Sequence, residues 1–104
     1  MFVALSRFVV KNDVSESDMS AEVRAAFLDR PHLVDDAPGY VRMDVISPRD
    51  NPDEFWLITY WEDEESFRTW HRGHTYHDAH KGIPKGLKLV RGEQFVRGFD
   101  HITS

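Results

Sequence analysis

Two stretches of this chain, residues 2–10 and 55–61, are apolar or aromatic at nearly every position. Runs of this length suit strands, and their β-branched and aromatic residues favour extended structure. A strand that is apolar on both faces needs cover on both sides, whereas a strand with one polar face does not. The fold must therefore place a layer on each side of the sheet that contains these two strands.

The residues between these two stretches predict one helix and one further strand. A helix is expected over residues 18–30, where Met19, Val23 and Phe27 recur every four positions and form an apolar stripe. Residues 40–47 alternate apolar with polar side chains, which predicts a strand with one wet face.

Turn-forming and capping residues place the remaining elements. Residues 48–53, Pro-Arg-Asp-Asn-Pro-Asp, are strong turn formers, and so predict that the second and third strands pair as a hairpin. Asp63 is suited to cap a second helix directly after the third strand. A last strand is expected over residues 87–99, with Gly92 and Gly98 as candidate bulges.

The order strand, helix, strand, strand, helix, strand is that of the ferredoxin-like split βαβ fold (βαββαβ), of the α+β class. It predicts a single domain over residues 1–104, with a four-stranded antiparallel sheet and both helices on one face. A chain of 104 residues has nothing left to cover the second face. The simplest solution is a homodimer packed sheet to sheet, which is a dimeric α/β barrel.

Composition excludes several classes of function. The net charge of −5 argues against nucleic acid as a partner, because phosphate binding needs a basic surface. The chain has no Cys, which excludes disulfides and thiolate chemistry and fits a reducing cytoplasm. No apolar run reaches the roughly 18 residues that span a bilayer, so neither a membrane partner nor a membrane location is expected.

Polar residues inside apolar stretches are the first candidates for a site. Ser6 and Arg7 interrupt the first strand and either face a cavity or serve in packing. Four His, namely His71, His74, His77 and His80, recur every three residues, so neighbouring pairs could chelate zinc or nickel on an unbroken helix. Gly73 interrupts that helix and disfavours the metal site.

The run from Thr59 to His80, TYWEDEESFRTWHRGHTYHDAH, is the most informative motif. Together with the preceding Pro-Gly-Tyr turn and the Phe-Trp-Leu-Ile strand, it resembles the antibiotic biosynthesis monooxygenase superfamily of dimeric ferredoxin-like barrels. Within that superfamily it is most similar to the IsdG-like haem-degrading monooxygenases. Those proteins carry a Trp at a strand end, an F-x-x-W segment and then an A-H pair, which Trp61, Phe67, Trp70 and Ala79-His80 match.

The resemblance implies roles for particular residues. His80 would be the metal ligand, axial to haem iron, and Trp70 the wall that presses the porphyrin out of planarity. The family keeps an Asn in the first strand where this chain has Ser6, whose hydroxyl has a shorter reach than an amide. Arg7 is the other candidate donor there.

The same resemblance implies a pocket for a large apolar disc with two anionic propionates. Its apolar lining would come from aromatic side chains, and its cation from a basic residue at the mouth. The candidates for the lining are Phe2, Phe8, Trp56, Phe67 and Trp70, and those for the cation are Arg7, Arg72 and Lys81.

Three functions follow as alternatives. The first is a haem-degrading monooxygenase that opens the porphyrin and releases iron, with haem as substrate and cofactor, dioxygen, and an external electron donor such as a separate reductase. The second is a cofactor-independent monooxygenase or isomerase acting on a small hydrophobic, aromatic or quinone-like substrate. The third is a haem-binding dimer without turnover.

Overall fold

The computed structural model describes residues 1–11, 19–29, 36–72 and 89–104. The order of its elements matches the expected βαββαβ order. The elements are β1 (Phe2–Val9), α1 (Met19–Leu28), β2 (Tyr40–Ile46), β3 (Glu54–Trp61), α2 (Glu64–Arg72) and β4 (Phe95–Asp100).

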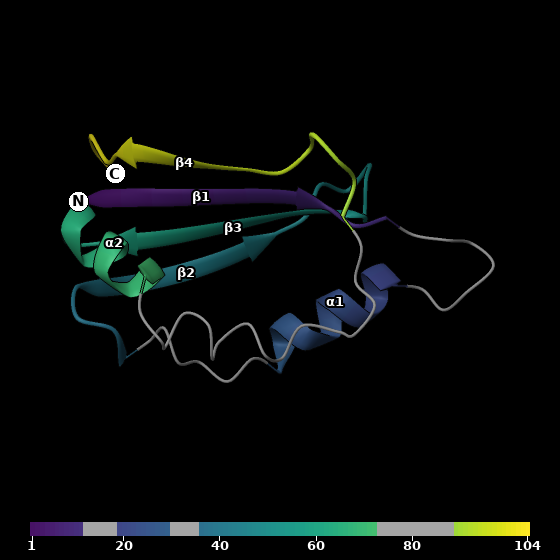
Figure 1. Cartoon of the computed structure of the whole chain (residues 1–104), viewed down its shortest axis with the longest axis horizontal. Coiled ribbons are helices and arrows are strands. Elements are labelled where there is room, and N and C mark those ends of the chain that lie inside the picture. The colour runs from purple at the N-terminus through teal and green to yellow at the C-terminus, as the bar shows by residue number, and fades with distance from the viewer. Residues whose placement is uncertain (12–18, 30–35, 73–88) are drawn as a thin grey trace.

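The four strands form one antiparallel sheet in the order β2-β3-β1-β4, so the two apolar strands lie at its centre (Figure 1). Pairing of β1 with β3 sets Phe2 opposite Trp61 at one end and Phe8 opposite Phe55 at the other. Because side chains alternate along a strand, this register decides which residues share a face.

The predicted hairpin between β2 and β3 is present. The Asn51 backbone N–H donates to the Pro48 carbonyl at 3.3 Å, and the Asp53 N–H donates to the Asn51 side-chain oxygen at 3.3 Å. Ser47 closes the turn by donating its hydroxyl to the Glu54 carbonyl at 2.7 Å. These local bonds hold the two strands in register.

Helix α2 begins as its sequence predicts. The Asp63 carboxylate accepts the backbone N–H of Ser66 at 2.8 Å, which is an N-cap bond. Hydrogen bonds from the Ser66 side chain and backbone lower the pKa of Asp63. The acidic residues of the first turn, Glu64 and Glu65, lie where the helix dipole favours negative charge.

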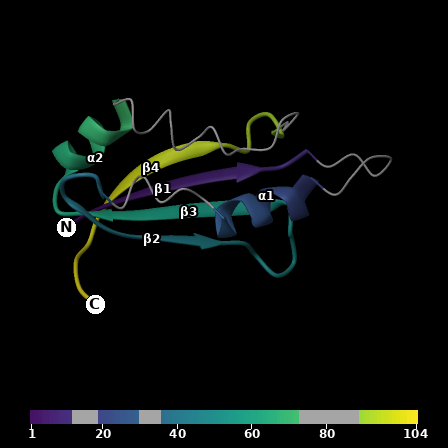
Figure 2. The ribbon, with the colours of Figure 1, turned by 90° about the horizontal axis from the view of Figure 1, so that it is seen from below.

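Both helices lie on the same face of the sheet, over opposite ends of it (Figure 2). The helix α1 packs Val23 and Phe27 against Phe8 and Phe55. At the other end, α2 packs Phe67 against the ring of Phe2, which lies on the same face of β1 as Phe8. The expectation of a one-sided helical layer is therefore confirmed.

The other face, called here the open sheet face, has no described helix packed on it. It consists of the residues that alternate with those under the helices and is largely apolar and aromatic. Its central members are Val3, Leu5, Arg7, Val9, Trp56, Ile58, Tyr60, Phe95 and Phe99.

The last strand is shorter than the 87–99 predicted from the sequence. It spans Phe95–Asp100, while Leu89 makes only an isolated bridge to Val10. Gly92, with φ +80, lies in a turn at residues 91–92, before β4 begins. Gly98 stays in unbroken register with Ala4, so neither glycine forms the expected bulge.

Candidate functional site

Five aromatic side chains gather under α2 at one end of the helix-covered face. We call them the aromatic cluster: Phe2, Tyr40, Trp61, Phe67 and Trp70. Trp61 lies at the centre and is fully buried, at 0% exposure. Its ring centroid lies 5.7 Å from Tyr40, 5.9 Å from Phe67 and 5.6 Å from Trp70. The sequence motif included Trp61, but nothing in its spacing marked it as the residue that three others contact.

Trp70 is placed by helical geometry and by ring packing. It follows Phe67 by one turn of α2, so both rings reach Trp61 from the same helix face. The Trp70 and Trp61 rings meet at 36°. The Trp61 indole N–H is buried and has no hydrogen-bond partner within the described ranges, so packing between rings holds this arrangement.

Ser6 lies on the helix-covered face at the middle of β1, opposite Leu57. On one side along the strand is the aromatic cluster, through Phe2. On the other side is a second aromatic group of Phe8, Phe27 and Phe55, with ring centroids 5.4–6.2 Å apart. The structure therefore brings Ser6 to the same face as Trp70 and Phe67, between the two helices.

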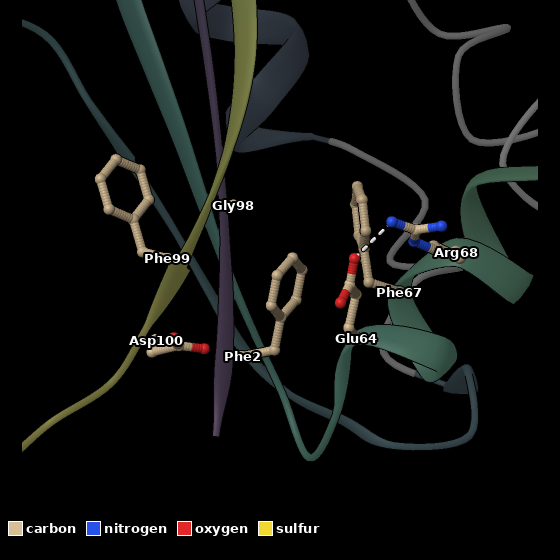
Figure 3. A pocket seen from close by; sticks show the side chains of 7 residues that line it. All are labelled: Phe2, Glu64, Phe67, Arg68, Gly98, Phe99 and Asp100. Atoms are coloured by element: carbon tan, nitrogen blue, oxygen red, sulfur yellow. Dashed lines mark hydrogen bonds and ion pairs between the residues drawn. The ribbon is translucent and has the colours of Figure 1, made fainter.

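A hollow of about 390 Å³ opens beside α2 (Figure 3). The rings of Phe2 and Phe67 stand next to each other in it, with centroids 5.6 Å apart, and the Arg68–Glu64 ion pair borders it. This volume falls in the range of small-molecule sites. Arg68 was not among the cations proposed from the sequence, although its spacing of four from Glu64 could have indicated the pair. The lining residues are Phe2, Glu64, Phe67, Arg68, Gly98, Phe99 and Asp100.

Arg7 and Trp56 lie on the open sheet face, which corrects their expected place in one pocket with Trp70. Arg7 pairs with Glu54 at 3.0 Å and with Glu93 at 2.9 Å. Its guanidinium also lies 5.8 Å from the Trp56 ring and 5.9 Å from that of Phe95. Strand alternation is the reason, because Ser6 and Arg7 are neighbours and must point to opposite faces.

These contacts shift the pKa values of Arg7 and Glu54. The hydrogen bond from Arg7 is the main cause that lowers the pKa of Glu54, and the bond from the Trp56 indole adds to it. Hydrogen bonds to Glu54 and Glu93 raise the pKa of Arg7. Arg7 is thus committed to two carboxylates on the open sheet face.

His80, the expected metal ligand, lies outside the described residues, as do His74, His77 and Lys81. His71 is described and lies on α2, its ring 5.4 Å from that of Phe67. Arg72, another proposed cation, donates its Nε–H to the Arg68 carbonyl at 3.2 Å. Within the described part of the chain, no three His, Asp or Glu side chains form a group that could hold a metal ion.

No helix among the described residues is long and apolar enough to cross a membrane.

Comparison of the sequence with known families finds one that spans most of the chain. Residues 1–82 match the family described as antibiotic biosynthesis monooxygenase. Over 91 residues the chain is 29% identical to the haem oxygenase (mycobilin-producing) of Mycobacterium tuberculosis, covering 82% of this chain and 87% of the relative.

Solved structures with the same fold include two with different chemistry. The haem degrader MhuD from Mycobacterium tuberculosis, solved with two haems in its active site, superimposes with a TM-score of 0.73 at 19% identity, over 100% of this chain and 98% of that one. SnoaB from Streptomyces nogalater, a cofactor-independent oxygenase, also gives 0.73, at 18% identity over 99% of this chain and 94% of that one. At these identities the likeness establishes the fold.

Proposed function

The chain belongs to the antibiotic biosynthesis monooxygenase family, and on that premise we propose that it binds haem on its helix-covered face and opens the porphyrin oxidatively with release of iron. One observation carries the proposal. Trp70 is held against the buried Trp61 at the end of α2, on the same face as Ser6, and the chain continues from α2 into the segment that contains His80.

The residue types on this face suit a large flat apolar ligand with an anionic edge. Three members of the aromatic cluster, Phe2, Phe67 and Trp70, supply the ring surfaces, and Phe2 and Phe67 also border the hollow. Arg68, which pairs with Glu64, lies at that border and replaces Arg7 as the candidate partner for a propionate, because Arg7 points to the open sheet face. The 29% identity to a haem oxygenase adds support from the sequence.

In this proposal each residue has a distinct task. His80 would hold the iron through its imidazole, and Trp70 would lie against the porphyrin. Ser6 offers the one hydroxyl of the β1 helix-covered face as a hydrogen-bond donor. Haem, when bound, supplies the iron at which dioxygen is activated. Electrons come from an external donor, and a separate reductase in the cytoplasm is the proposed source.

A second candidate function rests on Ser6 and on the size of the hollow. Where haem degraders of the family carry an Asn, this chain has a hydroxyl of shorter reach. The hollow of about 390 Å³ also suits a small aromatic substrate. A cofactor-independent oxygenase, as SnoaB is described, is therefore the alternative. A haem-binding protein without turnover is the third possibility.

Two steps of one experiment separate these functions. Titrating the protein with haemin should shift the Soret band and saturate at about one haem per chain if the site takes haem. An absent shift would leave the cofactor-independent function. Adding ascorbate in air should then bleach the Soret band of a haem degrader, whereas a binder without turnover should keep its spectrum.

The proposed assembly is a homodimer formed by two open sheet faces. This face carries Trp56, Tyr60 and Phe95 beside the Arg7 ion pairs, a mixture of aromatic side chains and Arg that is typical of the centres of interfaces. Both described helices pack on the opposite face of the sheet, so neither of them covers this one. A second copy would remove this surface from water.

A further inference from the structure

The geometry points to Tyr40 and Trp61 as positioning residues that fix the plane of the Trp70 ring. The inference rests on the proposed function in one respect, which is that Trp70 borders the substrate. The packing that carries it is independent of what that substrate is. Neither residue is one of those proposed to touch the ligand, and each acts through its neighbour.

Trp61 is the fixed surface in this arrangement. It is fully buried, and its ring is contacted by Phe67 at 65° and by Trp70 at 36°. A ring enclosed in this way cannot turn without displacing its neighbours, because protein interiors are close-packed. The tilt of Trp70 therefore follows the tilt of Trp61.

Tyr40 sets the tilt of Trp61. Its ring meets the Trp61 ring edge to face, at 82° and 5.7 Å, which is a favoured geometry for aromatic pairs. Tyr40 is also the residue opposite Trp61 in the pairing of β2 with β3. The contact is thus anchored by the sheet and does not depend on side-chain packing alone.

The turn before Tyr40 connects the Tyr40–Trp61 contact with helix α2. The Tyr40 N–H donates to the Ala37 carbonyl at 3.1 Å, and the Gly39 carbonyl accepts the Glu62 N–H at 2.8 Å. Gly39 has φ +83, and a Cβ at this position would collide with the Ser66 side chain. The turn therefore lies directly against the first turn of the helix that carries Trp70.

Two constraints thus converge on Trp70. The position of α2 is fixed by the contact between Gly39 and Ser66, and the ring plane is fixed by Trp61 through Tyr40. Replacing Tyr40 by an aliphatic residue removes the second constraint and leaves the first. The expected result is a Trp70 ring that is still present on the site but has lost its defined tilt.

The test uses Tyr40→Leu, with Tyr40→Phe as the conservative variant and Tyr60→Leu as the matched control. Tyr60 precedes Trp61 but faces the open sheet face, under Arg42. The first readout is the exciton circular dichroism of the Trp61–Trp70 pair in the protein without ligand. Trp61→Phe and Trp70→Phe identify this signal, because either one must abolish it.

We expect Tyr40→Leu to lose most of the exciton signal, and Tyr40→Phe and Tyr60→Leu to keep it. With the substrate that the wild type turns over, Tyr40→Leu should lower kcat by up to about 10²-fold at nearly unchanged KM, the cost of a small misplacement. A wild-type exciton signal in Tyr40→Leu would overturn the inference, as would an equal loss in Tyr60→Leu.

Should Tyr40→Leu fail to fold, judged by its melting curve, Tyr40→Met removes the ring with less disturbance because Met adapts to irregular space. The same two outcomes then apply to Tyr40→Met. Failure of the proposed function has a different signature, since wild type would then show no Soret shift with haemin while the exciton result still stands.

Discussion

Arg7 and Glu54 form an ion pair at 3.0 Å across the two central strands, on the face of the sheet that carries no described helix. Their side chains are only 17% and 14% exposed, and Glu93 closes the other side of the guanidinium. The guanidinium lies beside the aromatic rings of Trp56 and Phe95. It joins β1, β3 and the turn before β4, so its ionisation affects how these segments hold together.

Acid should therefore weaken the fold through Glu54. Its pKa is below the ordinary 4.5 in the folded protein, since Arg7, Trp56 and Asn51 all donate hydrogen bonds to it. Because the pKa of Glu54 is lower in the folded protein than in the unfolded chain, ionised Glu54 stabilises the fold fully above about pH 4.5. This stabilisation is lost as the pH falls below that value. Melting temperatures measured from about pH 6 to about pH 3 should fall less steeply in Glu54→Gln than in wild type. The exposed Glu22→Gln should follow the wild-type curve.

The open sheet face should make the protein a dimer. Light scattering at micromolar concentration should give about twice the chain mass of 12.1 kDa. Ile58→Asp, opposite Leu5 at the centre of this face, should yield unfolded protein instead of a soluble monomer, because the bare face is apolar. Ala25→Asp, on the exposed side of α1, serves as the control and should remain dimeric. A monomeric wild type would contradict the proposed assembly.

His80 should be the residue on which haem binding depends. His80→Ala is expected to lose the Soret shift with haemin while its circular dichroism and melting curve stay close to wild type, because only a ligand bond is removed. His71→Ala, His74→Ala and His77→Ala should bind haemin much as wild type does. A His77→Ala variant that loses the shift while His80→Ala keeps it would place the ligand three residues earlier.

Ser6 should limit turnover if haem is the substrate. Ser6→Asn restores an amide donor on the helix-covered face and is expected to raise the rate of ascorbate-driven Soret loss by up to about 10²-fold, the effect of one preorganised donor. Trp70→Ala should lower that rate while haemin still binds. Brisk degradation by wild type, unchanged in Ser6→Asn, would mean that the donor lies elsewhere; Arg7, on the opposite face, is no candidate in the same chain.

Gly39 should tolerate substitution less well than Gly92. Both have positive φ, +83 and +80, so an alanine at either costs about 1–2 kcal/mol in backbone strain. Gly39→Ala also forces its Cβ against Ser66, whereas a Cβ at Gly92 meets nothing within 4 Å. Thermal unfolding should show a larger loss for Gly39→Ala, at about 4–8 °C for each kcal/mol. Equal melting temperatures for the two variants would contradict the close packing of the turn on α2.

The sequence by itself determined the elements and their order, because local chemistry decides these. Apolar runs gave β1 and β3, turn formers gave the β2–β3 hairpin, and Asp63 gave the start of α2. The two-sided apolar pattern of β1 also predicted that both faces of the sheet need cover, and two helices can supply it for only one of them. The end of the chain was predicted less well. In the sequence, Gly92 is compatible with a turn or with a bulge in a strand, and the structure places it in a turn.

Only the tertiary structure decided which side chains share a site. Ser6 and Arg7 are both polar residues in an apolar strand, and strand pairing sends one to the helices and the other to Glu54 and Glu93. Trp61, at the end of β3, became the centre of the aromatic cluster because two other elements, β2 and α2, place rings against it. Such convergence depends on contacts between residues that are distant in the chain, and no local pattern records it.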